Sequence, residues 1–356
     1  MKLKQLNFYL IISILICNYC KTNEIYHIAS GKIAEIKMTV RLDSIEATKL
    51  FETESTFDNK KILDYENLKA MTKNFSVDYS TVYLLKTIYQ DRKNLEIQKK
   101  YVELSEKLIK NPDSMKVEIE SLKKYSFVFV PGLAYKIDTT TGADFFRQRT
   151  WFQKKGISTE LIETDELGLT IPNAKLIENY IRQYKKQNKI VLVSASKGGL
   201  DVIYYLEKLA TKEDLKKIHS WVNVGGILRG TLIADQHCDF PLSIVPAALL
   251  GLKGRTLELV GDIRRSSKVN FFNNLEFEKQ IKIIHLVAIP FRSQVRKEVL
   301  SRYLTLAEHG PNDGLTLISD TIFPKGRIIS EIGLDHFFKD ENIDLKTAAI
   351  AILLTR

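Results

Sequence analysis

The chain has 356 residues, of which 44% are hydrophobic and 27% are charged, and this balance excludes a disordered or fibrous protein. The formal net charge of +10 is spread along the sequence without a basic cluster, so we expect no nucleic-acid partner. The length suits one large domain or two smaller ones.

Residues 1–20 have the pattern of a signal peptide. A lysine-bearing start precedes a twelve-residue apolar run from 6 to 17, which is too short to span a bilayer comfortably. Because Cys17 and Cys20 stand where small residues are usual, a lipoprotein signal with one acylated cysteine is the alternative to a plain secretory signal or a short signal anchor. We expect export, as a secreted protein or as a membrane-anchored lipoprotein of the periplasm or cell envelope. Cys238 is the only other cysteine, so an exported domain would have no internal disulfide.

Residues 21–120 are predicted to form a helical N-terminal region. The sequence has no glycine between Lys32 and Pro131, and turn-rich β structure normally needs glycine. Apolar residues follow helical spacing from Asp78 to Ile109, and Asp78 or Ser80 would serve as the N-cap. We find no catalytic constellation in this region and expect a structural role.

From residue 121 onward, apolar strands alternate with helices. Strands are predicted at 126–130, 157–164, 189–194, 220–226, 281–289 and 326–332, and helices at 139–155, 171–187, 200–209 and 345–354. Strands that are apolar on both faces are typical of a parallel sheet covered by helices on both sides. We therefore predict an α/β fold with a mostly parallel sheet, formed by residues 121–356 as one domain.

The segment SASKG at 194–198 joins a predicted strand to a predicted helix, with small residues on both sides of Ser196. A nucleophile on a sharp strand-to-helix turn needs small neighbours, because its backbone is held at positive φ. The segment thus predicts Ser196 as nucleophile and the Lys197 N–H as an oxyanion donor. One alternative is a Ser194–Lys197 pair, which needs both residues on one helical turn. The other is that the small residues only let the turn close.

Three further positions supply what such a serine needs. Gly132 follows the first predicted strand and permits close backbone approach, so the Leu133 N–H is the second predicted oxyanion donor. Asp313, in an Asn-Asp-Gly turn that we expect to be exposed, is the predicted acid, and His336 is the predicted base. The Lys197 side chain is expected to lie in solvent at the mouth of the site.

The chain resembles the α/β-hydrolase superfamily, and within it the lipase-like serine esterases. The resemblance covers roughly residues 125–340 and rests on five motifs in the family's order, which are VPGL (130–133), SASKG (194–198), GGILRGT (225–231), NDGL (312–315) and GLDH (333–336). Pro131 stands where bacterial lipases typically have histidine, and Ser194 replaces the first glycine of the serine turn. The resemblance implies acyl transfer by a Ser-Asp-His triad on a small-molecule or lipid ester, with no metal or cofactor.

Other polar residues offer alternatives for these roles. Asp320 is the fallback acid, whereas Asp335 is expected to shape its loop, because chain neighbours rarely hydrogen-bond as a triad requires. His309 is expected to be a bystander. The segment ADQHCD at 234–239 holds metal-ligating residue types, but its spacing matches no common zinc pattern.

The apolar run at 240–252 lies in a segment, 235–260, that we predict to be a lid. An apolar lid would favour esters with acyl chains and would add to membrane association. The alternative is a core helix.

The same triad also serves thioesterases, polyester depolymerases and peptidases, and these enzymes are alternatives to an esterase. A protein with the hydrolase fold that has no catalysis and acts as a surface or binding protein is the alternative outside enzymes.

Overall fold

The computed structural model describes residues 25–54, 64–238, 242–275, 281–323 and 325–355. The predicted signal peptide at 1–20, including Cys17 and Cys20, lies outside the described residues.

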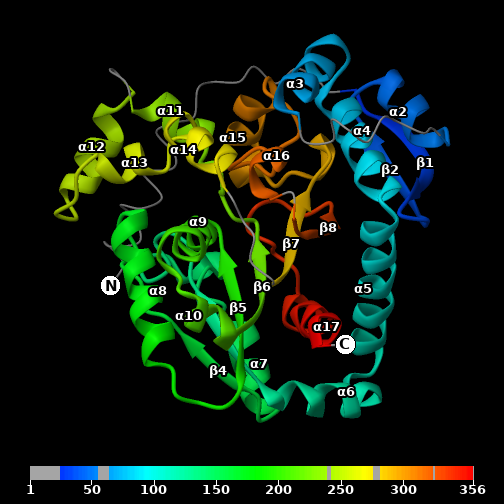
Figure 1. The fold of residues 1–356 in the computed structure, drawn as a ribbon. Coiled ribbons are helices and arrows are strands. Elements are labelled where there is room, and N and C mark those ends of the chain that lie inside the picture. Colours follow the sequence, from blue (N-terminus) through cyan, green and yellow to red (C-terminus); the bar gives the residue numbers. More distant parts are fainter. Residues whose placement is uncertain (1–24, 55–63, 239–241, 276–280, 324, 356) are drawn as a thin grey trace.

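A six-stranded parallel sheet forms the centre of the molecule (Figure 1). Its strands, in spatial order, are β4 (Ser158–Leu161), β3 (Tyr125–Val130), β5 (Lys189–Ala195), β6 (Ile218–Val224), β7 (Lys282–Ile289) and β8 (Arg327–Ile332). Each predicted strand is confirmed, and so is the α/β class with a parallel sheet.

Helices cover both faces of this sheet because its strands are apolar on both faces. Phe127 and Val191 point into one core with α5 (Arg92–Lys110), α6 (Lys116–Ser121), α7 (Phe146–Lys154) and α17 (Ile343–Thr355). Val128 and Leu192, one residue further along each strand, point into the other core with α8 (Thr170–Gln183) and α9 (Lys197–Tyr204). Alternation of this kind produces the continuous apolar runs seen in the sequence.

The N-terminal region begins with an antiparallel hairpin, so the expectation of helices throughout 21–120 is wrong at 27–42. Strands β1 (His27–Ile33) and β2 (Ile36–Leu42) pair along their full length. The two-residue turn between them has positive φ at Ala34 (52°) and Glu35 (63°), a conformation that usually calls for glycine or asparagine. Absence of glycine therefore misled the prediction, because two other residues take the left-handed conformation here.

The remainder of this region is helical, as predicted, with α2 (Ile45–Glu52), α3 (Tyr65–Asn74), α4 (Val77–Gln90) and then α5. The N-cap of α4 is Ser76 rather than Asp78 or Ser80. Asp78 instead lies buried and accepts hydrogen bonds from the backbone N–H groups of Asp43 (2.9 Å) and Arg292 (2.8 Å). Burial, together with the charge of Asp43, raises the pKa of Asp78 to about 8.

Helix α5 covers the free edge of the sheet at β8. The Gln98 side chain donates to the Ser330 carbonyl (3.1 Å) and accepts from the Ser330 N–H (2.9 Å). The Ile328 N–H donates to the Asn94 side chain (3.1 Å). These amide side chains occupy groups that another strand would otherwise pair with, so the N-terminal region protects the edge and packs as one unit with the sheet.

An insertion between β6 and β7 forms α11 (Leu232–His237), α12 (Ile244–Gly251), α13 (Glu258–Asp262) and α14 (Arg265–Asn273), drawn in yellow-green tones in Figure 1. Helix α12 has no buried residue, and Leu252 beside it is 76% exposed. The core-helix alternative for 240–252 is therefore wrong for the described residues.

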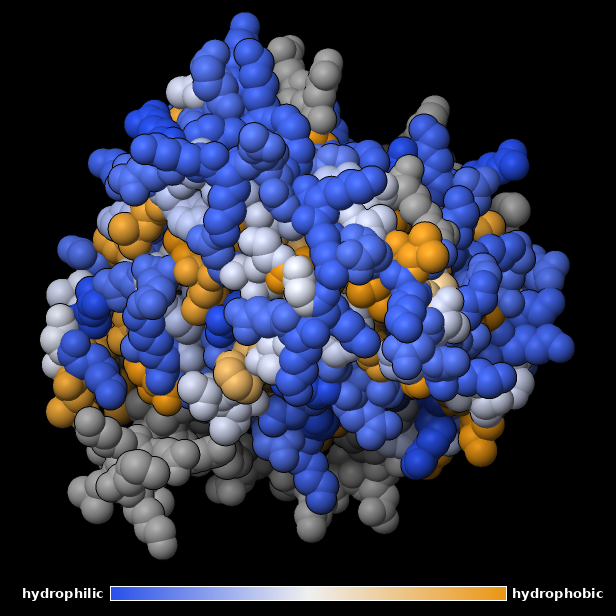
Figure 2. All heavy atoms as spheres, turned by 90° about the horizontal axis from the view of Figure 1, so that it is seen from below, coloured by the Kyte–Doolittle hydropathy of each residue, from blue (hydrophilic) through white to orange (hydrophobic). Residues whose placement is uncertain are grey.

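The face of the molecule in Figure 2 is largely hydrophilic, with apolar residues in separate small patches. Within the described ranges, no helix combines the length and apolar character needed to cross a bilayer.

Candidate active site

Ser196 lies on a tight turn between β5 and α9, with φ 50° and ψ −122°. Close packing requires the small residues around it: a Cβ on Gly198 would lie 2.4 Å from the Pro131 carbonyl oxygen. Ser194 is buried and accepts a hydrogen bond from Trp221 Nε1 (2.8 Å). Since Ser194 belongs to β5 and Lys197 begins α9, the two do not share a helical turn, and the Ser194–Lys197 alternative is wrong.

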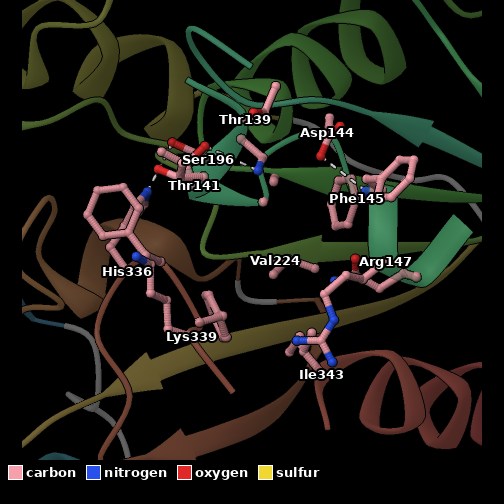
Figure 3. A pocket seen from close by; sticks show the side chains of 18 of the residues that line it. Thr139, Thr141, Asp144, Phe145, Arg147, Ser196, Val224, His336, Lys339 and Ile343 are labelled. Atoms are coloured by element: carbon pink, nitrogen blue, oxygen red, sulfur yellow. Dashed lines mark hydrogen bonds between the residues drawn. The ribbon is translucent and has the colours of Figure 1, made fainter. Parts of the chain in front are cut away.

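Ser196 is the first member of a hydrogen-bonded relay (Figure 3). The distance from Ser196 Oγ to His336 Nε2 is 3.0 Å. The distance from His336 Nδ1 to Asp313 Oδ2 is 2.7 Å. An ionised Asp313 keeps the imidazole proton on Nδ1, so Nε2 is free to accept the serine proton. The structure thus brings together the three predicted residues.

Asp313 is only 1% exposed, so the expectation of an exposed turn is wrong. Its Oδ1 accepts from the backbone N–H groups of Leu315 (2.9 Å) and Thr316 (2.8 Å), which turn the carboxylate inward. These bonds leave Oδ2 for His336 and hold the acid in place.

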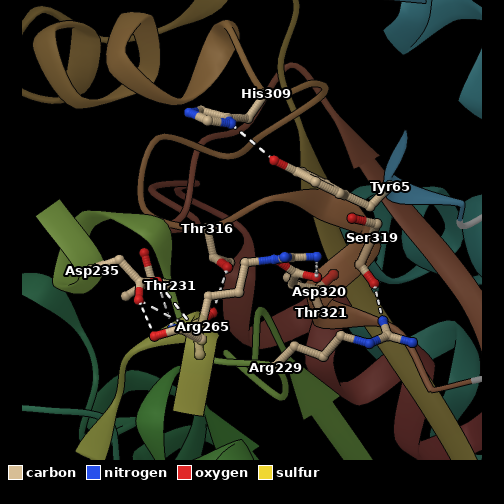
Figure 4. Close-up of polar contacts among 12 residues, drawn as sticks. Tyr65, Arg229, Thr231, Asp235, Arg265, His309, Thr316, Ser319, Asp320 and Thr321 are labelled. Atoms are coloured by element: carbon tan, nitrogen blue, oxygen red, sulfur yellow. Dashed lines mark hydrogen bonds and ion pairs between the residues drawn. The ribbon is translucent and has the colours of Figure 1, made fainter. Parts of the chain in front are cut away.

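The alternative acids and bases have other partners (Figure 4). Asp320 is buried and pairs with Arg265 (2.7 Å), and His309 Nδ1 bonds the Tyr65 hydroxyl (2.9 Å). Asp335 pairs with Arg296 through two bonds of 2.6 and 2.8 Å, which agrees with its expected role in shaping the loop.

The two predicted oxyanion donors flank Ser196. Gly132 N donates to the Ala143 carbonyl and Ala134 N to the Glu166 carbonyl, each at 3.0 Å, so Leu133 is held between two fixed amides. In the described part of the chain neither the Leu133 N–H nor the Lys197 N–H donates to a protein acceptor. Both are therefore available to an oxyanion at Ser196.

The Lys197 side chain is 2% exposed, so its expected position in solvent is wrong. Its Nζ pairs with Asp201 Oδ1 at 2.7 Å, one helical turn later, and Asp201 Oδ2 accepts from Asn173 Nδ2 at 3.1 Å. Burial raises the pKa of Asp201 to about 6, against the opposing charge of Lys197. This pair anchors Lys197, whose N–H is a predicted oxyanion donor.

Replacing Lys197 with methionine should be costly, because it leaves the Asp201 charge buried without a partner. We expect the free energy of unfolding to fall by about 3–5 kcal/mol in chemical denaturation. The double variant Lys197→Met/Asp201→Leu should recover most of that loss.

The matched control is Lys107→Met, which removes a lysine from an exposed pair with Glu103 (2.6 Å) at the same helical spacing. Its effect should stay below about 1 kcal/mol. Equal costs for the two lysine variants would contradict a structural role for the buried pair.

A pocket of about 720 Å³ opens beside Ser196 and His336. Its walls come mainly from 138–148 and 336–343 (Figure 3), and its apolar lining includes Leu133, Phe145, Val224, Leu286, Phe338 and Ile343. This size is typical of sites for small organic ligands.

The segment predicted as a lid, 235–260, supplies none of the pocket's lining among its described residues. It packs elsewhere, since Arg255 pairs with Asp165 at 2.7 Å. The prediction that segment 235–260 lies over the pocket as a lid is therefore wrong for this conformation.

The segment ADQHCD shows no metal centre in its described part. Asp235 accepts from Arg264 Nε (3.2 Å) and Arg265 N (2.9 Å). Across the described residues, no group of three or more His, Cys, Asp or Glu could hold a metal ion.

No protein-family model matches the sequence, and no curated protein sequence matches it. Solved structures do match. The metagenomic carboxyl esterase MGS0156 is 20% identical, with a TM-score of 0.55 over 65% of this chain and 76% of its own. The Bacillus licheniformis lipase BlEst2 in its propeptide form is 19% identical, with a TM-score of 0.51 over 60% of this chain and 47% of its own. Together with the sheet order and the serine turn, these matches show that the chain has the α/β-hydrolase fold.

Proposed function

We propose that this protein is a serine esterase that cleaves carboxylic esters with apolar acyl groups. The observation that carries the proposal is Ser196, held at positive φ and linked to Asp313 through His336 by distances of 3.0 and 2.7 Å. The fold matches include proteins named as a carboxyl esterase and a lipase, which supports ester hydrolysis in general.

The geometry supports acyl transfer in two steps. Ser196 Oγ attacks the ester carbonyl carbon while His336 Nε2 takes its proton, and the oxyanion accepts from the N–H groups of Leu133 and Lys197. His336 then protonates the departing alcohol, which leaves an acyl group on Ser196. Water, deprotonated by His336, releases the acid and restores the serine. Each oxyanion donor contributes a factor of about 10² to 10³ in rate.

We also propose that the protein is exported, because residues 1–20 carry a signal-peptide pattern. Membrane association through the N-terminus, and through the partly exposed apolar helix α12, belongs to this proposal. The partner is a small-molecule or lipid ester, and the sequence has no basic cluster for nucleic acid.

A series of nitrophenyl esters from acetate to decanoate tests the substrate class. We expect kcat/KM to rise about threefold to fourfold for each added methylene while the chain remains inside the pocket, since a buried methylene contributes about 0.8 kcal/mol. Thioesters and amides with the same acyl groups are the controls. A flat ester series, or faster cleavage of thioesters or amides, would contradict the proposal.

A further inference from the structure

The pocket beside Ser196 contains an arginine that forms no ion pair with any carboxylate among the described residues. Arg302, on α15 (Lys297–Ala307), lines the pocket together with Ser196 and His336. Its Nη2 donates one long hydrogen bond to the Glu298 carbonyl (3.4 Å), and its guanidinium lies 5.8 Å from the centre of the Phe337 ring. In the described part of the chain, no carboxylate lies within 4.0 Å of it.

The two carboxylates whose charges act most strongly on Arg302 are those of Asp335 and Asp313, and both bind other groups. Asp335 forms two bonds with Arg296, and both oxygens of Asp313 are occupied by His336 and two backbone N–H groups. Burial lowers the pKa of Arg302, and the charges of Asp335 and Asp313 oppose that shift. A guanidinium has five N–H donors, so most of those on Arg302 are available to a ligand.

A second unpaired cation lines the same pocket. Lys339 is exposed, three residues after His336, and Figure 3 shows it on the His336 side of the site. No ion pair joins it to another described residue. Arg147, which also lines the pocket, differs because its Nη2 pairs with Asp344 at 3.0 Å.

The lining also holds four acidic residues, and three of them have partners of their own. Asp340 pairs with Lys346 (2.5 Å), Asp144 accepts from Phe146 N (3.1 Å), and Asp138 accepts from Thr140 N (3.0 Å). Glu341 is exposed. Of the three cations that line the pocket, Arg147 has an ion pair, whereas Arg302 and Lys339 form none with any described residue.

His336 must protonate the alcohol as it leaves, so the alcohol part of an ester lies on the His336 side of the pocket. We propose that Arg302 and Lys339 form an anion subsite there, and that the preferred substrates are esters whose alcohol carries a carboxylate or phosphate. Guanidinium groups bind both anions through paired hydrogen bonds. This inference rests on the proposed esterase function and adds its leaving-group specificity.

Two matched ester pairs test the subsite on the full chain. One is nitrophenyl butyrate and its ring-carboxylated analogue, and the other is glycerol monobutyrate and its glycerol phosphate analogue. The wild type should favour the anionic member of at least one pair, and the larger preference identifies carboxylate or phosphate as the group recognised. The preference should shrink as salt is added.

Arg302→Met should lower kcat/KM for the preferred anionic ester by about tenfold to a hundredfold, the range expected for a charge-assisted hydrogen bond. Its effect on the neutral ester should stay below about threefold. Lys339→Met should cause a smaller loss of the same selectivity, Arg302→Lys should retain part of it, and Lys107→Met, distant in sequence and outside the lining, should leave it unchanged.

Equal rates for charged and neutral esters in the wild type would overturn the subsite. An equal fall in kcat/KM for the charged and the neutral ester in Arg302→Met would also overturn it. Arg302 would then affect catalysis in general, through the charge of Asp313, and would not bind the anionic group. If circular dichroism shows that Arg302→Met is unfolded, the test uses Arg302→Lys and Lys339→Met instead. For each variant, kcat/KM is compared between the charged and the neutral ester. Absence of any ester cleavage by the wild type is a different result, which refutes the esterase proposal itself.

Discussion

Replacing Ser196 with alanine is expected to lower kcat for ester cleavage by about 10⁴- to 10⁶-fold, the loss typical of removing a triad nucleophile. The turn should survive, because alanine keeps the small side chain that the turn needs and removes only the hydroxyl that bonds to His336. Circular dichroism and thermal unfolding should therefore match the wild type, while turnover of nitrophenyl butyrate falls to the background rate.

Ser194→Ala is the matched control for this variant. Ser194 lies two residues earlier in the same segment, and its hydroxyl accepts from Trp221 Nε1 at 2.8 Å. Its loss should leave a buried indole N–H unsatisfied and lower the free energy of unfolding by about 1–3 kcal/mol, with activity largely retained. If Ser194→Ala abolished turnover and Ser196→Ala did not, the assignment of the nucleophile would be wrong.

Asp313→Asn should lower kcat by about 10⁴-fold. An asparagine amide can donate to His336 Nδ1, which would move the imidazole proton to Nε2 and prevent that nitrogen from accepting the Ser196 proton. Steady-state kinetics on the same ester measures the effect. Asp320→Asn is the control, because Asp320 pairs with Arg265 and should matter for stability rather than for kcat. The reverse pattern would make Asp320 the acid.

The strands and the triad could be predicted because each has a local signal. Strands apolar on both faces reveal a covered parallel sheet, and small residues around Ser196 reveal a turn with positive φ. Asp313 and His336 followed from their order in the chain and from the turns that hold them. These signals do not depend on knowing which distant segments meet.

Other features depend on contacts between segments that are far apart in the sequence, and the sequence did not predict them. The spacing of Lys197 and Asp201, one helical turn apart, is visible in the sequence. That both side chains are buried follows only from the packing of α9 against the sheet. Gln98 protects the edge strand β8 by a hydrogen bond to Ser330, a residue 232 positions later in the sequence. The hairpin at 27–42 has a turn without glycine, and the pocket walls come from 138–148 and 336–343 rather than from 235–260.

Labelling with a fluorophosphonate probe, followed by mass spectrometry of the peptides, tests the central claim most directly. Such probes phosphonylate a serine only where a base activates it and oxyanion donors hold the product. We predict one adduct, on the peptide that carries Ser196, and its loss in Ser196→Ala and His336→Ala. A wild-type protein that stays unlabelled, or an adduct on another residue that persists in Ser196→Ala, would contradict the assignment of this site as a serine hydrolase centre.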